Sequence, residues 1–213
     1  MQKRNNSPCE KSLFITFEGV EGAGKSTLIQ SLYTYFNRKK IPCLHTHEPG
    51  GTPVGEQLRE MLLHRRSNIM GKKTELLLFL ADRSNHVEQV ILPALQEGSI
   101  VLCDRFNDST IAYQSNEETD ESKLQQLCDF ATGNLQPNIT FLLDIDPSMS
   151  LNRLKNRDHF ENKELAFHKR IRQKFLDLAS VHSKRFHILN ATLSKSEVFE
   201  LALSTIQEVI EYV

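Results

Sequence analysis

Short apolar runs alternate with longer segments of mixed polarity along this chain. Five runs rich in β-branched and aromatic residues predict strands, at 13–17, 43–47, 99–104, 139–144 and 186–189. Apolar residues spaced three or four apart predict helices at 27–37, 55–63, 74–95, 108–114, 122–132, 147–156, 167–181 and 195–213. The run at 99–104 is almost wholly apolar until its last residue, as in strands covered on both faces. Strands that alternate with helices predict a parallel sheet between two layers of helices.

One α/β domain of the three-layer α/β/α type, with a five-stranded parallel sheet, accounts for residues 12–213. That range contains no internal repeat, linker or low-complexity stretch. Residues 1–11 are polar and lack the apolar centre of a secretory signal, so we expect a disordered extension there. Apolar runs also fall short of the roughly 20 residues of a membrane span, which predicts no membrane partner.

Charge and cysteine content narrow the possible partners and the compartment. The chain has 26 Lys and Arg against 27 Asp and Glu, so it lacks the basic field expected of a nucleic-acid-binding protein. An anion would have to be recognised by a few placed arginines. The cysteines lie far apart, at Cys9, Cys43, Cys103 and Cys128, and neither they nor the histidines show metal-ligand spacing. They are typical of free thiols in a reducing cytoplasm.

The glycine-rich stretch at 19–26, Gly-Val-Glu-Gly-Ala-Gly-Lys-Ser, matches the pattern G-x-x-x-x-G-K-[ST]. In such a P-loop the backbone N–H groups surround phosphates, Lys25 reaches the β- and γ-phosphates, and the Ser26 hydroxyl ligates Mg²⁺. The helix that follows directs its positive end at the same anion. A simple turn is the alternative, but the strand before and the helix after favour phosphate binding. The residues expected to contact ATP here are Gly19, Val20, Glu21, Gly22, Ala23, Gly24, Lys25, Ser26 and Thr27.

Two further strand ends carry candidate chemistry. Asp104 ends the strand at 99–104, where a carboxylate can hold Mg²⁺ or a metal-bound water beside a P-loop. A local pair between Asp104 and Arg105 is the alternative. Glu48-Pro-Gly-Gly-Thr-Pro follows the second strand, and glycine and proline content alone suits a ligand loop and an ordinary turn equally.

Two other features could serve either structure or function. Phe79 and Arg83 lie one turn apart on a predicted helix, and a ring beside a guanidinium would suit a base with a phosphate nearby. Their residue types alone favour a core phenylalanine and a solvated arginine. The basic segment around 153–164 is either a solvated surface or a lid that brings arginines to a transferring phosphoryl group. A P-loop in the same chain implies a bound triphosphate, which favours the lid.

Together these signals resemble the thymidylate kinases, P-loop enzymes that phosphorylate dTMP to dTDP. The resemblance runs from about Leu13 to Val213 and is clearest at 17–27, 48–52, 75–83 and 104–114. Glu-Pro-Gly-Gly-Thr and Asp-Arg-Phe-x-Asp-Ser-Thr are nearly specific to that family. The resemblance implies a P-loop NTPase fold with a helical lid, ATP as donor with Mg²⁺, dTMP as acceptor, a place in dTTP synthesis, and a homodimer.

The resemblance also implies roles for individual residues. Glu21 would lie near the acceptor 3′-hydroxyl, Phe79 would stack on thymine, and Arg83 would lie near the base. Arg105 would bind the acceptor phosphate, while Thr110, Tyr113 and Gln114 would read the base and crowd the 2′ position. The remaining implied contacts are Glu48 and Pro49 with the acceptor, Asn190 and Ala191 with adenine, and Ser26 and Asp104 with the metal.

The P-loop of this chain has no arginine at positions 21–23, so the resemblance to the bacterial-type design implies that the lid supplies one. Arg153 and Arg157 therefore join Lys25 and Arg105 as catalytic candidates. The chain departs from the family at 115–121, which is acidic, and at His47 and His159, where arginine is common. Rival functions are another P-loop kinase with a different acceptor, and a nucleotide-binding regulator without catalysis.

Overall fold

The computed structural model describes residues 12–63, 70–115, 120–153, 160–161 and 163–211. Its sheet has the order β2-β3-β1-β4-β5, and every neighbouring pair is parallel. The strands are β1 (Leu13–Glu18), β2 (Cys43–His47), β3 (Ile100–Asp104), β4 (Ile139–Asp144) and β5 (Phe186–Asn190). The predicted five-stranded parallel sheet is confirmed. The extension expected at 1–11 lies outside the described residues.

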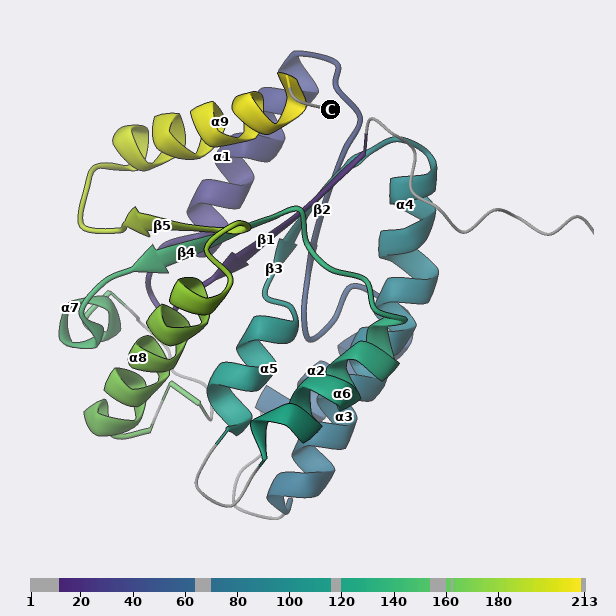
Figure 1. The fold of residues 1–213 in the computed structure, drawn as a ribbon, viewed down its shortest axis with the longest axis vertical. Helices are drawn as coiled ribbons and strands as arrows, with labels where there is room; N and C mark the ends of the chain where they lie inside the picture. Colours follow the sequence, from purple (N-terminus) through teal and green to yellow (C-terminus); the bar gives the residue numbers. More distant parts are fainter. Residues whose placement is uncertain (1–11, 64–69, 116–119, 154–159, 162, 212–213) are drawn as a thin grey trace, which may run out of the picture.

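Helices connect the strands in the predicted order. They are α1 (Lys25–Arg38), α2 (Pro53–Leu63), α3 (Lys72–His86), η1 (Val87–Ile91), α4 (Leu92–Gln96), α5 (Asn107–Gln114), α6 (Glu121–Thr132), α7 (Pro147–Leu151), α8 (Leu165–Val181) and α9 (Lys195–Glu211). Figure 1 shows α1 and α9 on one side of the sheet and α4, α5 and α8 on the other. No helix in the described ranges is long and apolar enough to cross a membrane.

Alternating residues of β1 pack into different parts of the core. Leu13, Ile15 and Phe17 belong to the large apolar cluster that includes α1 and α9. Phe14 belongs to a second cluster with Val87 and neighbouring residues of η1, α4 and β3. Because β1 is central and buried on both faces, the P-loop at its carboxyl end starts from a rigid strand. The predicted burial of the strand at 100–104 is also confirmed.

The helix predicted over 74–95 is one helical path with a wider turn inside it. Residues 87–91 form a π-helix, in which Leu92 N–H donates to the carbonyl of Val87, five residues back. Pro93 follows at once and has no N–H to offer the carbonyl four residues before it. The missing donor gives a local reason for the wider turn, which periodicity does not predict.

The helix predicted at 147–156 is shorter than expected. It begins at Pro147 after Asp146, whose side chain accepts from Ser148 N, and it ends at Leu151. A tight turn closes it, with Arg153 N–H donating to the Ser150 carbonyl at 3.0 Å. In the part of the following segment that the structure describes, residues 152–153, 160–161 and 163–164, there is no helix, so the helical character expected of the lid is absent from those residues.

Candidate active site

The P-loop adopts backbone conformations that require its glycines. Gly19 has a φ of +136°, and a Cβ there would meet the Leu143 carbonyl oxygen at 2.6 Å. Gly24 precedes α1 with a left-handed φ of 104°. Lys25 follows at the start of α1, and its Nζ donates to the carbonyls of Gly19 and Val20 at 3.0 Å each. Burial, and then the charge of Arg105, lowers the pKa of Lys25 to about 8.

Ser26 and Asp104 meet where α1 begins and β3 ends. The Ser26 hydroxyl donates to Asp104 Oδ2 at 2.9 Å, and both residues line the same pocket. A hydroxyl and a carboxylate at this spacing form a hard oxygen donor set of the kind that Mg²⁺ prefers, so these residues fit the metal expected of them. Arg105 forms its ion pair with Glu21 instead, which argues against the local Asp104–Arg105 pair.

Arg83 is buried and not solvated, contrary to what its residue type favoured. Its Nε donates to Glu48 Oε2 at 2.6 Å, Nη1 to Thr110 Oγ1 at 2.6 Å and Nη2 to the Phe106 carbonyl at 3.0 Å. The guanidinium thereby ties the end of β2 to α5 across the pocket wall. Burial alone would lower its pKa, but the Glu48 charge raises it, so Arg83 is a fixed cation.

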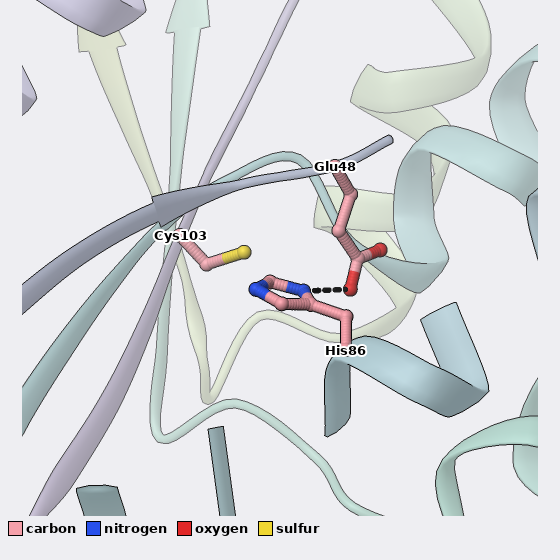
Figure 2. Close-up of side chains that lie close together, drawn as sticks. All are labelled: Glu48, His86 and Cys103. Atoms are coloured by element: carbon pink, nitrogen blue, oxygen red, sulfur yellow. Dashed lines mark hydrogen bonds and ion pairs between the residues drawn. The ribbon is translucent and has the colours of Figure 1, made fainter. Parts of the chain in front are cut away.

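Glu48 has a second partner in His86, and Figure 2 shows both beside Cys103. His86 Nδ1 lies 2.9 Å from Glu48 Oε1, and its Nε2 lies 2.6 Å from Thr46 Oγ1. The three side chains place one potential ligand atom each within 4.8 Å of one another. Burial raises the pKa of the Cys103 thiol well above its usual value, and the thiol donates to the Arg105 carbonyl at 3.2 Å. Because these lone pairs and protons are already committed, the cluster is structural and does not fit a metal site.

The loop after Glu48 is held by hydrogen bonds to its backbone. Asp82 Oδ1 accepts from Gly50 N–H at 2.9 Å, and the Pro49 carbonyl accepts from Arg59 Nη1 at 2.6 Å. The peptide bond between Glu48 and Pro49 is cis. Burial, and then the Glu48 charge, raises the pKa of Asp82 to about 7. His47, where arginine is usual in the family, pairs with Glu56 at 3.2 Å and also lines the pocket.

Glu21 links the P-loop to Arg105 and Tyr113. Its Oε1 accepts from Arg105 Nη2 at 3.2 Å and from the Tyr113 hydroxyl in a shorter bond. Arg105 itself has a left-handed φ of 71°, and its Nη1 donates to Ser109 Oγ at 3.0 Å. Burial alone would raise the pKa of Glu21, but the contact with His168 and the charges of Arg105 and Lys25 lower it to about 2. Glu21 is therefore an anion within a positively charged site.

Aromatic rings form another wall of the pocket. Phe79 is partly buried, and its ring centroid lies 6.0 Å from that of Phe160, which also lies 6.0 Å from Tyr113. Gln114 Nε2 donates to Glu75 Oε1 at 2.8 Å beside this wall. Phe79 thus lines the pocket together with Arg83 and Gln114.

Of the two residues predicted to contact adenine, only Ala191 lines the pocket. Asn190 is exposed, does not line the pocket, and accepts from Thr192 N and Oγ1 within its own turn. Ala191 does line the pocket, and its carbonyl accepts from Arg153 Nη2 at 3.4 Å. The wall continues through Leu193, Ser194, Lys195 and Val198. Arg157, the other lid candidate, lies outside the described residues.

Most of the predicted residues surround one pocket of about 1060 Å³. Those that line it are Glu21, Gly22, Ala23, Gly24, Lys25, Ser26, Thr27, Glu48, Pro49, Phe79, Arg83, Asp104, Arg105, Thr110, Tyr113, Gln114, Arg153 and Ala191. Gly19 and Val20 belong to the loop but do not line it. The P-loop and the start of α1 form one end of the pocket, and an aromatic, arginine-containing wall from α3 and α5 forms the other.

Sequence reasoning missed three residues at this site. Glu18 ends β1 and accepts from Phe106 N at 2.8 Å and Ser109 Oγ at 2.6 Å, which fixes the loop that carries Arg105. Phe160 is the only aromatic residue in its polar segment, and that contrast was the available signal. His168 is fully buried and lies in register with Ile171, Phe175 and Leu178 on the buried face of α8. A histidine in such an apolar stripe was the signal for a buried polar contact.

Comparisons with known proteins identify the family. The family model described as thymidylate kinase matches residues 17–202. A thymidylate kinase of Protochlamydia amoebophila is 42% identical over 210 residues, covering 93% of each chain. One from a Synechococcus strain is 46% identical over 187 residues, covering 87% of this chain and 90% of its own.

Solved structures agree. The crystal structure of a thymidylate kinase from Ehrlichia chaffeensis matches with a TM-score of 0.73 and 33% identity. The match covers 92% of this chain and 98% of the other. With matching family model, sequence relatives and fold, the chain belongs to the thymidylate kinase family.

Proposed function

We propose that the chain transfers the γ-phosphate of ATP to dTMP, giving dTDP for dTTP synthesis. As a member of the thymidylate kinase family it is a nucleotide kinase. The observation that carries the proposal is the position of Glu21, a P-loop residue bonded to Arg105 and Tyr113 in the pocket that Lys25 also lines. Donor and acceptor elements therefore share one cavity.

The reaction needs charge neutralisation more than a base. The acceptor is a phosphate and is already a nucleophile at neutral pH, but its oxygens must approach a triphosphate. Lys25 would bind the donor phosphates, and Arg105 the acceptor phosphate, so that both charges are screened during in-line transfer. Losing one such contact typically costs on the order of 3 kcal/mol, or about a hundredfold in rate.

Ser26 and Asp104 would hold Mg²⁺ with the donor. Their 2.9 Å contact supplies two oxygen ligands beside the P-loop. When bound, the ion would neutralise charge on the phosphate oxygens. An arginine from a lid at about 153–164 would add further positive charge, and Arg153 and Arg157 are the candidates.

Base recognition would fall to the aromatic end. Phe79 would stack on the thymine, while Arg83, Thr110 and Gln114 present fixed polar groups around it. The thymine methyl adds about 1 kcal/mol of apolar burial, so discrimination against dUMP should be modest. A cytosine edge or a 2′-hydroxyl would leave buried polar groups mismatched and should be rejected more strongly.

We also infer a homodimer built on α2, α3 and α6. Phe130 of α6 is 87% exposed, and Met61 of α2 and Leu77 of α3 are exposed as well. These helices pack side by side, α2 on α3 and α3 on α6. Exposed apolar side chains on neighbouring helices are typical of a surface that a second copy covers. Sedimentation velocity tests this: a mass near the 24.5 kDa of one chain would contradict it.

The rest of the proposal concerns organisation and compartment. Residues 12–213 would form one kinase domain, with contacts to the acceptor through Glu48 and Pro49 and to adenine through Ala191 and its neighbours. Free cysteines at positions 43, 103 and 128 are typical of proteins in a reducing cytoplasm, where we place the enzyme.

A coupled assay of ADP release tests the function. With Mg-ATP as donor, the acceptors dTMP, dUMP, dCMP, dGMP and UMP are compared. We expect dTMP to be preferred, dUMP to be used less well, and the others to be poor. Lys25→Ala should remain folded by circular dichroism and lose nearly all turnover. Absence of dTMP-dependent ADP release from folded, ATP-binding wild type would refute the proposal and favour another acceptor or a regulatory module.

A further inference from the structure

His168 is a fully buried polar side chain in the first turn of α8. Its Nδ1 lies 3.3 Å from Glu21 Oε2, an ion-pair distance that lacks full hydrogen-bond geometry. α8 follows the predicted lid and packs on α5, β4 and β5. The histidine therefore reaches Glu21 of the P-loop from α8, whereas Arg105 reaches it from the end of β3.

The two carboxylate oxygens of Glu21 have different partners. Oε1 accepts from Arg105 and Tyr113, whereas Oε2 is buried and has no hydrogen-bond partner within the described residues. His168 Nδ1 forms an ion-pair contact with Oε2. Because an ionised carboxylate only accepts, the ring must present its Nδ1 proton to it, and we assign the tautomer on that basis.

This arrangement fixes a rotation that the other partners leave free. Donors at Oε1 alone restrain one oxygen of the carboxylate, and the group can still rotate about its terminal torsion, which has broad minima. A donor at Oε2 restrains the second oxygen as well. Glu21 then presents one orientation to the pocket.

We propose that His168 is a positioning residue, which fixes the carboxylate of Glu21 toward the 3′-hydroxyl of the acceptor sugar. The inference rests on the proposed function, because the contact between Glu21 and the sugar is part of it. It adds a residue from the lid side of the molecule to the control of acceptor binding.

The test pairs three variants with two acceptors. His168→Phe keeps a ring and removes the donor, and His168→Asn restores an N–H donor on a smaller side chain. Ile171→Val is the control, because Ile171 lies one turn along α8 and is fully buried in the apolar cluster. Shortening this side chain therefore disturbs the packing of the same helix face. The acceptors are dTMP and its 3′-deoxy analogue, with kcat/KM measured for each and folding checked by circular dichroism and Tm.

We expect His168→Phe to lower kcat/KM for dTMP by about tenfold, the lower end of what a polar contact with a charged group contributes. With the 3′-deoxy analogue, which has no hydroxyl for Glu21 to bind, the variant and wild type should differ by less than about twofold. His168→Asn should recover most of the loss, and Ile171→Val should change both acceptors equally.

Two results would overturn the inference while leaving the proposed function intact. One is dTMP turnover by His168→Phe equal to wild type, and the other is an equal loss with both acceptors, which would make His168 purely structural. If wild type itself does not phosphorylate dTMP, the proposed function fails first and this inference fails with it.

Discussion

Glu48→Gln should destabilise the protein strongly through an uncompensated buried charge. Glu48 bonds Arg83 at 2.6 Å and His86 at 2.9 Å, and the Glu48 and Arg83 side chains are only 2–3% exposed. Gln has nearly the same volume, so no cavity forms. Its amide accepts at only one atom, so the Arg83 guanidinium, whose side chain is 3% exposed, loses its counter-charge.

The expected cost can be worked from these contacts. Breaking a buried ion pair from one side typically costs about 3–5 kcal/mol. Two features place this case at the lower end. Arg83 keeps its bonds to Thr110 and Phe106, and Asp82, whose pKa Glu48 helps to raise, can ionise once that charge is gone. A loss of about 3 kcal/mol corresponds to a fall in Tm of roughly 6–12 °C for a chain of this size.

Thermal unfolding followed by circular dichroism measures the effect. Glu121→Gln is the control, because the pair between Glu121 and Lys174 is 50% and 24% exposed and should contribute under about 1 kcal/mol. If both variants lose the same small amount of stability, the ion pair between Glu48 and Arg83 does not behave as a buried charge pair. A rise in KM for dTMP should accompany the loss of stability, since Arg83 lines the pocket.

The other predictions concern the lid and pH. Arg157→Ala should lower kcat far more than it raises KM for dTMP. Arg153→Ala should mainly raise KM for ATP, because Arg153 donates to the Ala191 carbonyl. Equal effects of the two variants in steady-state kinetics would contradict these different roles. Burial, and then the Asp108 charge, raises the pKa of Glu18 from 4.5 to about 7. Between these pH values the folded state retains a proton that the unfolded state releases, so the free energy of unfolding should fall as the pH rises. Glu18→Gln should flatten that slope in urea unfolding from pH 5 to 7, and an unchanged slope would assign the titration to Asp82.

The sequence predicted features whose cause is local. β1, the P-loop and α1 follow from an apolar run, glycine spacing and helical periodicity, all within a short stretch. Asp104 could be placed because the carboxyl ends of parallel strands meet at one edge of a sheet. These inferences needed no knowledge of distant contacts.

What the sequence did not predict depends on distant partners. Residue type suggested a solvated Arg83, because the carboxylate that pairs with it follows another strand. His168 was missed for the same reason, because its contact with Glu21 exists only once α8 packs against the sheet. The π-helix at 87–91 was missed for a different reason: helical periodicity carries no sign of one added residue in a turn.

The strand order divides the pocket according to the parts of the chain that build it. β1 is central, and most of the aromatic, arginine-containing end comes from β2, β3 and their following helices, within residues 43–114, while Glu21 and Phe160 join it from outside that range. The opposite end, with Ala191 and Arg153, comes from the β4 and β5 side, within residues 143–198. Most of the proposed acceptor wall can therefore vary in evolution, or be redesigned, within one continuous stretch while the β4 and β5 side stays unchanged. Residues 43–114, with a matching residue at position 160, are the natural unit to exchange between relatives in making chimeric kinases.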